Sequence, residues 1–318
     1  MFRKRYLLLV LLTLCGASMG QDGSKTIKSE EYLTKRPESV NPDTRAQGEL
    51  TRGGVNRQQS GRPQSGGRAR VYSVDKNFPV GPPPREQEYV RIGVTIWRFS
   101  PAQCPIPDCP LPAAGQKGLV DTAEGVRADD SSAFSTGERV RLALESLSHD
   151  GFIYIINREQ FADKTFGDPY LIFPTRNIYK GNNYARPGSQ IQLPRAQGCF
   201  CVKARNSQKA LVADNLVVII SPQPLLAADE IGAKEIPLPA KLVKFLIRAD
   251  KERAHRGALQ DGVGLTQTPA ESQAGSKGLF DTEPTLTQDD LPPQNFYQSL
   301  VPRGTPAVFS VNLRYAKP

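Results

Sequence analysis

The stretch Gly137–Asn157, GERVRLALESLSHDGFIYIIN, decides the fold class. Its first half alternates apolar with polar residues, which is the period of a half-buried β-strand. Asp150-Gly151 gives a turn signal, and Phe152–Ile156 follows as a β-branched and aromatic strand. The pattern predicts a β-hairpin. Its first strand has Val140, Leu142 and Leu144 on one face and Arg139, Arg141, Ala143 and Glu145 on the other.

Further strands are spaced along the rest of the chain. Glu88–Phe99 is apolar on both faces, which predicts an interior strand of a two-layer fold. Shorter strands are expected at Leu171–Phe173, Gln190–Leu193, Phe200–Lys203, Leu216–Ile220 and Ala307–Tyr315. Strands at this spacing, separated by Gly and Pro turns, predict an all-β fold, an antiparallel β-sandwich over residues 86–318.

One helix and one loop interrupt the strands. Apolar residues recur at helical spacing after Pro239, which predicts an amphipathic helix at about 240–256 that covers one side of the sandwich. Binding of this helix to a membrane surface is the alternative, but Asp250 and Glu252 dilute its basic face. Polar, Gly- and Thr-rich sequence at about 260–287 predicts a mobile loop before the last strand.

Residues 1–20 have the three-part pattern of a secretory signal. We expect cleavage after Gly20 and an exported mature chain, periplasmic or extracellular. The apolar run is far below the roughly 20 residues that span a bilayer. A lipoprotein signal is disfavoured because Leu14 precedes Cys15, where a small residue is required. No later run approaches spanning length, so no transmembrane segment is expected after cleavage.

The positive charge of the chain is concentrated before the folded part. The net charge is +9, and residues 1–20 carry three basic residues and no acidic one, which leaves +6. Residues 21–85 hold 12 Lys+Arg against 7 Asp+Glu, or +5, and residues 86–318 hold 26 against 25. Because residues 21–85 are rich in Arg, Gly and Pro and poor in large apolar residues, we expect a disordered linker.

A solvated spacer is the simplest role for this basic linker. Arg-Gly tracts bind nucleic acid inside cells, but export argues against a nucleic-acid partner. The charge motivates a further hypothesis, loose attachment to anionic envelope polymers or lipid head groups. Retention of full-length and linker-deleted protein on envelope fractions, at low and high salt, tests it; equal retention would exclude it.

Four cysteines remain after cleavage: Cys104, Cys109, Cys199 and Cys201. An even number in an exported chain favours disulfides. Cys199 and Cys201 lie two apart on a strand, with Cα atoms roughly 6.5 Å apart, at the limit of disulfide reach. We therefore expect both to be cross-linked to the 104–109 loop, with the pairing open. A Cys₄ zinc site is the alternative, but its usual spacing is tighter, so no metal and no cofactor are expected.

Catalysis by a cysteine would need a base, and the chain has only His149 and His255. His149 is expected in the hairpin turn, and His255 at the end of the helix, where it suits the helix dipole. Phosphate loops, His-Glu-x-x-His pairs and Gly-x-Ser-x-Gly elbows are missing. The pairs Asp129-Asp130 and Asp289-Asp290 lack calcium-loop spacing. We expect no enzyme activity; an envelope enzyme that uses a cysteine is the alternative.

Several short motifs occur in an order that resembles a known bacterial family. They are GVTIWR at 93–98, GERVRL at 137–142, DGFIYIIN at 150–157, LIFP at 171–174 and LTQDDLPPQ at 286–294. Together they resemble the domain-of-unknown-function family numbered four-three-eight-four, from roughly residue 86 to the C-terminus. The resemblance implies an exported or envelope accessory β-domain, elsewhere attached to caspase-like peptidase or protein-kinase modules. It supplies no catalytic residues.

These observations predict an exported, non-catalytic module that binds a protein or glycan of the cell envelope. Tyr170, Tyr179 and Tyr184 lie in and beside a Gly/Asn-rich loop between strands, where exposed aromatic residues form contact surfaces. For any single tyrosine, a structural role in the loop is the alternative.

Overall fold

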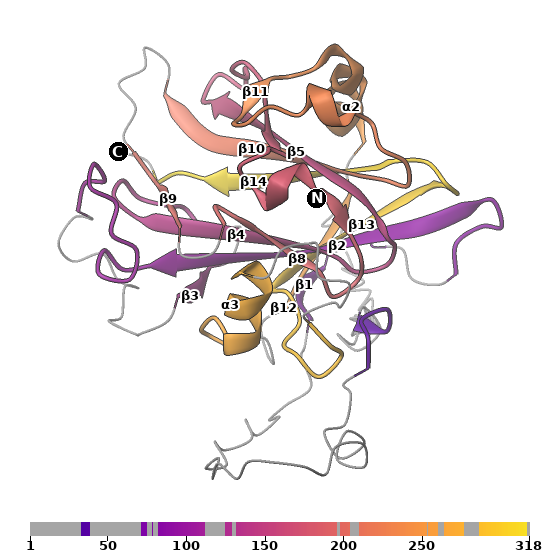
Figure 1. The fold of residues 1–318 in the computed structure, drawn as a ribbon, viewed down its shortest axis with the longest axis horizontal. Coiled ribbons are helices and arrows are strands. Elements are labelled where there is room, and N and C mark those ends of the chain that lie inside the picture. Colours follow the sequence, from indigo (N-terminus) through magenta and orange to yellow (C-terminus); the bar gives the residue numbers. More distant parts are fainter. Residues whose placement is uncertain are drawn as a thin grey trace, which may run out of the picture.

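The computed structural model describes residues 33–38, 71–74, 78, 82–111, 125–128, 132–195, 198–203, 210–252, 254–259, 264–276 and 286–316. The expected secretory signal lies outside these residues, as does Asp129-Asp130. Two antiparallel sheets stack face to face, with one helix beyond each of them (Figure 1). The prediction of an antiparallel β-sandwich is therefore confirmed.

The larger sheet has eight strands in the order β1-β12-β13-β2-β4-β8, with β3 paired to β2 and β9 to β4. Their bounds are β1 Val71–Val74, β2 Gln87–Phe99, β3 Val126–Ala128, β4 Arg139–Ser146, β8 Gln190–Leu193, β9 Phe200–Cys201, β12 His255–Leu259 and β13 Asn295–Pro302.

The smaller sheet has six strands in the order β11-β6-β5-β10-β14, with β7 paired to β5. Their bounds are β5 Gly151–Phe161, β6 Tyr170–Phe173, β7 Tyr184–Ala185, β10 Leu211–Ser221, β11 Ile236–Pro237 and β14 Ala307–Arg314. Every strand expected from the sequence is present.

The main core lies between the inner faces of the two sheets. The larger sheet contributes alternate residues of β2 and β4, and the smaller sheet contributes alternate residues of β5, β10 and β14. The inward residues of β4 are on the apolar face identified from the sequence, Val140, Leu142 and Leu144, and those of β2 are Val90, Ile92, Val94 and Ile96. Burial of each such side chain contributes roughly 1.5–3 kcal/mol to stability, which is enough to fix which face of each strand points inward.

The predicted hairpin is wrong, although both of its strands exist. β4 pairs with β2, β8 and β9, whereas β5 pairs with β10, β6 and β7. The connection between them crosses from one sheet to the other, and Leu147 is buried within it. Gly151 is required for a close approach, because a Cβ there would lie 2.9 Å from Ile220 Cγ2 and 3.0 Å from Ser221 O. Each strand is apolar enough to be interior to its own sheet.

A helix covers the outer face of the smaller sheet. Helix α2, Ala240–Lys251, packs Leu242, Phe245, Leu246 and Ala249 against that face. It is shorter than expected, because the chain becomes extended at Glu252 and enters β12. His255 therefore lies in β12, paired in register with Gln298 of β13, and not at the end of the helix.

The expected mobile loop at 260–287 is only partly described, and its described part is ordered. Helix α3, Pro269–Ser276, lies within it, so the prediction of a loop is wrong there. Thr268 and Glu271 hydrogen-bond reciprocally at its start: Thr268 N donates to Glu271 Oε2 at 2.9 Å, and Glu271 N donates to Thr268 Oγ1 at 3.2 Å. Gln192 of β8 donates to Glu271 O at 2.7 Å, which ties α3 to the larger sheet.

Two segments of the expected disordered linker are likewise ordered. β1 pairs with β12, and residues 33–38 lie against the larger sheet with Leu33 and Arg36 buried. A short polar segment is held there because it gains hydrogen bonds and a buried ion pair from residues distant in sequence. The rest of residues 21–85, apart from 78 and 82–85, lies outside the described residues. Among described residues, no helix has the length and hydrophobicity to cross a membrane.

Candidate binding cleft

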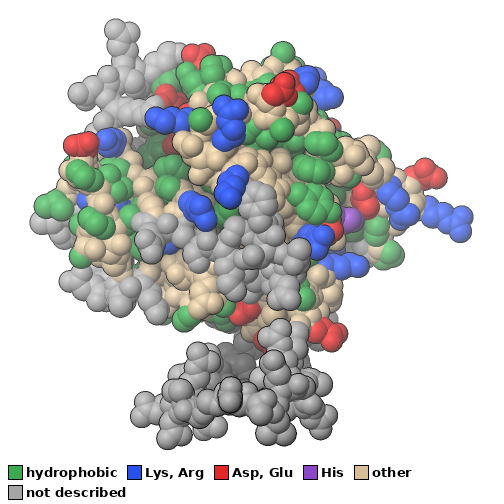
Figure 2. All heavy atoms as spheres, viewed as in Figure 1, with side chains coloured by type: hydrophobic (Ala, Val, Ile, Leu, Met, Phe, Trp, Pro, Cys, Tyr) green, Lys and Arg blue, Asp and Glu red, His purple; other side chains and the backbone are tan. Residues whose placement is uncertain are grey.

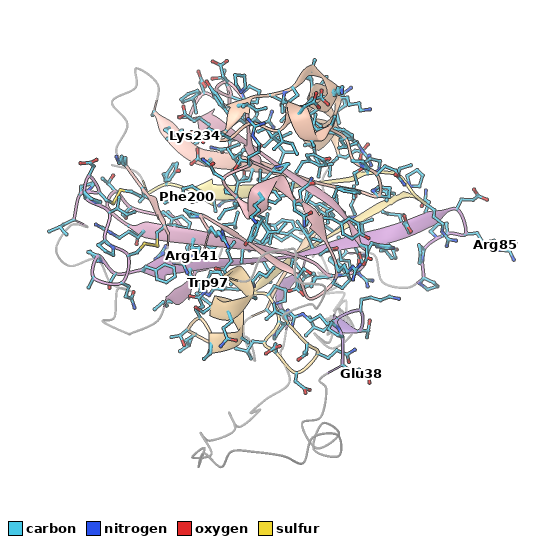
Figure 3. The ribbon with its side chains drawn as sticks, viewed as in Figure 1. Glu38, Arg85, Trp97, Arg141, Phe200 and Lys234 are labelled. Carbon is cyan, nitrogen blue, oxygen red and sulfur yellow. A yellow bond between two sulfur atoms is a disulfide. The ribbon has the colours of Figure 1, made fainter. Side chains whose placement is uncertain are left out.

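A cleft of about 860 Å³ opens between the sheets at one end of the sandwich. The larger sheet lines it with β4, β8 and β9, and the smaller sheet with β5, β6, β10 and the end of β14. Phe200 of β9 and Lys234, just before β11, line it from the two sheets; Figure 3 labels both. The cleft interrupts the close packing between the sheets and combines apolar with polar lining, which makes it the candidate site.

Apolar residues form the deep wall of the cleft. Four leucine and valine residues belong to the main core and also line the cavity: Val140 and Leu142 of β4, Leu193 of β8 and Leu216 of β10. Phe134, Tyr170, Phe200 and Tyr315 add aromatic rings. Phe200 is 45% exposed and Tyr170 is 43% exposed, so two rings stand at the rim.

The cleft begins where the inner face of the smaller sheet becomes polar. Along β5 the inward positions are Ile153, Ile155 and then Asn157, and Asn157 is in register with Leu216 of β10. Asp214 of β10 and Glu159 of β5 form the next inward pair. The hydroxyl of Tyr315 donates to the Asp214 carboxylate. Burial of polar side chains in a dry core would lower the stability of the fold. At these inward positions the two sheets are separated by the cleft and do not pack against each other.

Charged residues of both signs surround the mouth of the cleft. Lys203 and Lys234 supply cations, and Glu159, Asp168 and Glu235 supply carboxylates. Arg158 also borders the cavity, but its guanidinium is bonded to Asn215 and Asp250 on the outer side of the sheet. Figure 2 shows lysine and arginine side chains dispersed over the face in view, as expected for a folded part of nearly balanced charge.

The three predicted contact tyrosines do not form one surface. Tyr170 lines the cleft. Tyr179 is 2% exposed and accepts a hydrogen bond from Gln192 N at 3.1 Å, and its burial raises the pKa of its hydroxyl. It cannot contact a ligand from this position, so that part of the prediction is wrong. The backbone at Tyr179 is left-handed (φ 49°), and its ring packs edge-on against Phe173.

Tyr184 lies away from the cleft, on β7. Its ring packs edge-on against Phe152, and its hydroxyl donates to Asp150 Oδ2 at 3.1 Å. Partial burial and this carboxylate raise the pKa of Tyr184. Tyr184 is thus a surface residue of the smaller sheet, not a wall of the cavity.

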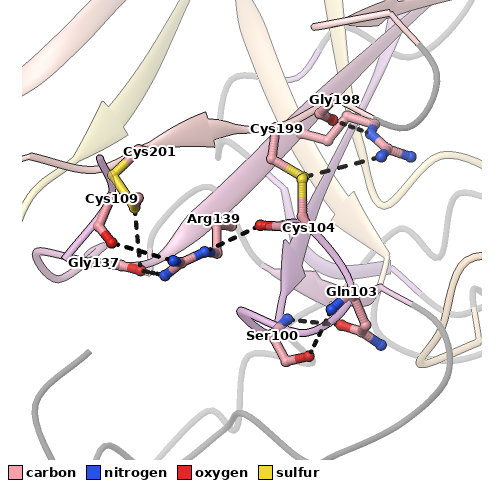
Figure 4. Close-up of a disulfide and its surroundings, with 10 residues drawn as sticks. Ser100, Gln103, Cys104, Cys109, Gly137, Arg139, Gly198, Cys199 and Cys201 are labelled. Atoms are coloured by element: carbon pink, nitrogen blue, oxygen red, sulfur yellow. Dashed lines mark hydrogen bonds between the residues drawn. A yellow bond between two sulfur atoms is a disulfide. The ribbon is translucent and has the colours of Figure 1, made fainter. Parts of the chain in front are cut away.

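The four cysteines form two disulfides, Cys104–Cys199 and Cys109–Cys201, as expected from the sequence (Figure 4). Both join the 104–109 loop to the strand region beside the cleft, and Cys201 itself lines the cavity. Arg139 of β4 holds the same loop by donating to the carbonyls of Cys104, Cys109 and Pro110. These bonds indicate an oxidising environment and fix one rim of the cleft.

Neither histidine has a cysteine among its described contacts, and the four described cysteines are in disulfides. His149 lies in the inter-sheet connection, where Nδ1 is 2.8 Å from Ser148 Oγ and Nε2 is 3.3 Å from Glu88 Oε2. Asp290 accepts from Thr287 N at 2.7 Å and thus closes a turn. No cluster of three or more His, Cys, Asp or Glu side chains suited to a metal occurs within the described ranges.

The sequence did not single out Asn157 and Asp214. In each case a polar residue takes the next position in a series of alternate apolar residues, and this break in the pattern can be seen in the sequence. Their meeting on one face of the cleft depends on the register between β5 and β10.

Scans against family models, curated proteins and solved structures found no match to this chain, so its resemblance to the four-three-eight-four family stays a prediction.

Proposed function

We propose that this chain is an exported, non-catalytic β-sandwich module that binds a glycan of the cell envelope in the cleft. The observation that carries the proposal is the composition of the cleft: aromatic rings at the rim and amide and carboxylate groups at inward positions. Sugars present C–H faces that pack on aromatic rings and hydroxyl groups that donate to carboxylate and amide oxygens. A cavity of about 860 Å³ lies within the size range of small-ligand sites.

A protein partner is the other occupant that the sequence suggested. A protein-binding surface is usually flatter and larger, with an apolar centre and a polar rim. The cleft is instead concave and has polar groups on its inner wall, which favours a small hydroxyl-rich molecule. The two disulfides beside the cleft support export to an oxidising compartment.

The test is a binding measurement on variants of the cleft. Soluble oligosaccharides released from cell-wall and outer-envelope polymers are titrated against the mature protein and followed by ligand-observed NMR. Tyr170→Ala is expected to weaken binding at least fivefold, because it removes an aromatic platform at the rim. Asn157→Leu is expected to weaken it further, because it fills the inner wall with an apolar side chain.

Tyr184→Ala is the matched control, since it removes a partly exposed tyrosine from the same sheet outside the cleft. Binding that is unchanged in the Tyr170→Ala and Asn157→Leu variants would place the ligand elsewhere and contradict the proposal. So would capture of envelope proteins, and no saccharide, by the immobilised wild-type protein.

The alternative is an envelope enzyme that uses a cysteine, and the two disulfides favour the binding module over a cysteine hydrolase. A nucleophilic hydrolase cysteine must be available as a thiolate, and all four cysteines of the expected mature chain are in disulfides. Thiol titration of the denatured, unreduced protein distinguishes the two candidates: a free thiol favours the enzyme.

A further inference from the structure

A segment from the N-terminal linker occupies a pocket on the outer face of the larger sheet. Arg36 inserts its guanidinium there and is 3% exposed. Nε and Nη2 donate to the two carboxylate oxygens of Glu145, both at 2.7 Å. Nη1 donates to the carbonyls of Thr287, Asp290 and Leu291 at 3.1–3.3 Å. One carboxylate and three carbonyls match the planar fork of a guanidinium, which an ammonium could not satisfy in the same geometry.

The pocket also binds the main chain on both sides of Arg36. The side-chain amide of Gln288 donates to Arg36 O at 2.9 Å and to Thr34 O at 3.4 Å, and Gln288 N donates to Pro37 O at 3.0 Å. Leu33 is 5% exposed and provides a second buried anchor. The folded part therefore recognises Leu33–Pro37 as a short peptide, through two side chains and three backbone carbonyls.

Contacts that do not involve Arg36 hold the walls of this pocket in place. The carboxylate of Asp290 accepts from Thr287 N and Thr287 Oγ1, which holds the 287–290 turn. Arg127 pairs with Glu271 and donates to Pro292 O, which fixes the end of the same segment. Glu145 projects from the outer face of β4. Such a preformed site needs little reorganisation when the peptide enters or leaves.

The electrostatics of the pocket call for a cation. Burial lowers the pKa of Arg36, but the charge of Glu145 and its hydrogen bonds more than offset this, so the pKa is raised above its ordinary value. Glu145 is 2% exposed, and its only described cation is Arg36. A buried carboxylate without its cation strongly lowers stability. Binding of another guanidinium to the emptied pocket would therefore be strongly favourable in free energy.

Residues 38–70 separate Leu33–Pro37 from β1 in the sequence. A chain of that length spans up to roughly 100 Å when extended, more than the width of a domain of this size. This length of chain does not confine the segment to its own pocket, so a pocket on a neighbouring molecule is also within its reach. Docking within one chain is favoured at low concentration by a high effective concentration, and exchange becomes competitive as protein concentration rises.

We propose that this pocket is a recognition site for a Leu-x-x-Arg-Pro peptide, and that it accepts the Leu33–Pro37 segment of a second copy of this chain. The exchanged segments join two copies through reciprocal docking, in the manner of a domain swap. This site lies on the outer face of the larger sheet and does not depend on the function proposed for the cleft.

Two complementary variants of the chain from Gln21 onward test the proposal. Arg36→Ala keeps the pocket but removes its ligand, whereas Glu145→Gln keeps the ligand but weakens its pocket. A labelled peptide of residues 30–39 is titrated against both by fluorescence anisotropy. The Arg36→Ala protein is expected to bind it at least tenfold more tightly than the wild type, whose own segment competes. Arg36→Ala in the peptide is expected to abolish binding.

Mixing the two variants then tests exchange between copies. Only a segment from the Glu145→Gln protein can fill the pocket of the Arg36→Ala protein, so a 1:1 heterodimer is expected by sedimentation velocity. Neither variant alone should dimerise. A mixture that stays monomeric at the highest soluble concentration would overturn the exchange. Equal affinity of the Arg36→Ala protein for both peptides would overturn recognition of arginine. Circular dichroism and intact disulfides verify that each variant is folded.

Discussion

The outer faces of the two sheets are covered by different chemistry. The smaller sheet is covered by α2, whose contact is apolar, with Leu242 and Phe245 at its centre. The larger sheet is covered by irregular segments and α3, and its outer face carries buried ions. Arg36–Glu145 and Arg127–Glu271 are both almost fully buried there. The comparison teaches that alternating charges on a strand do not by themselves indicate a solvent-facing side.

Arginine side chains add to the packing on the outer face of the larger sheet, beside a small apolar cluster of Trp97, Phe99, Cys104 and Ala143. Besides the two ion pairs, Arg141 donates to Gly198 O at 2.8 Å and lies 4.4 Å from the centroid of the Phe99 ring. Arg139 binds several carbonyls of the 104–109 loop. Burial lowers the pKa of both guanidinium groups. A guanidinium has enough donors to hold a loop that offers only backbone carbonyls.

The largest effect should come from breaking the buried ion pair of α3. Arg127→Ala leaves the Glu271 carboxylate buried without its cation, and we expect a loss of about 4 kcal/mol in the free energy of unfolding. Urea denaturation measures it. The double variant Arg127→Met with Glu271→Gln removes both charges and should recover most of the loss. A loss in Arg127→Ala below about 1 kcal/mol would mean that the ion pair contributes no more than a surface pair.

Truncation of an apolar side chain between α2 and the smaller sheet should lower the free energy of unfolding by less than Arg127→Ala does. Leu242→Ala removes a fully buried side chain from the helix–sheet contact, and we expect a loss of about 3 kcal/mol from lost burial and the remaining cavity. Val243→Ala is the control on the same helix, because Val243 is 42% exposed and should change stability by less than about 0.5 kcal/mol. Equal losses in thermal or urea unfolding would contradict the apolar account of this face.

The smallest effect is expected for the ion pair between α2 and β5. Asp250→Ala removes the carboxylate that pairs with Arg158, but the Asp250 side chain is 45% exposed. Arg158 also retains Asn215 Oδ1 at 2.9 Å and the Phe166 ring. We expect a loss of at most about 0.5 kcal/mol, reduced further by salt. A loss comparable to that of Arg127→Ala would remove the distinction between the two faces.

The sequence predicts the layers of this fold better than their connections. Period-two alternation identified the strands and the inward face of β4, because burial on one face fixes side-chain direction. The Asp150-Gly151 signal is the same for a hairpin and for a crossing between sheets, so local sequence could not distinguish them. The choice depends on β4 and β5 finding separate partners far along the chain.

Other features were missed for two different reasons. Helix α3 had a readable start, since Thr268-Pro269-Ala270-Glu271 has a capping residue, a first-turn proline and a glutamate at the third helical position. The pocket for Arg36 had no such local signal, because it is assembled from β4, residues 287–291 and the Leu33–Pro37 segment, which are far apart in the sequence. The disulfide pairing was likewise open, because both strand-side cysteines lie within reach of the same loop.

The crossing at Leu147–Asp150 has a consequence for how this protein assembles its native state. Along the chain, strands join the larger sheet, then the smaller, and then alternate again until β14 completes the smaller one. Every contiguous fragment that contains all the described strands of one sheet also contains strands of the other. Pairings of high contact order must therefore form together, and the two layers should fold and unfold slowly as one cooperative unit.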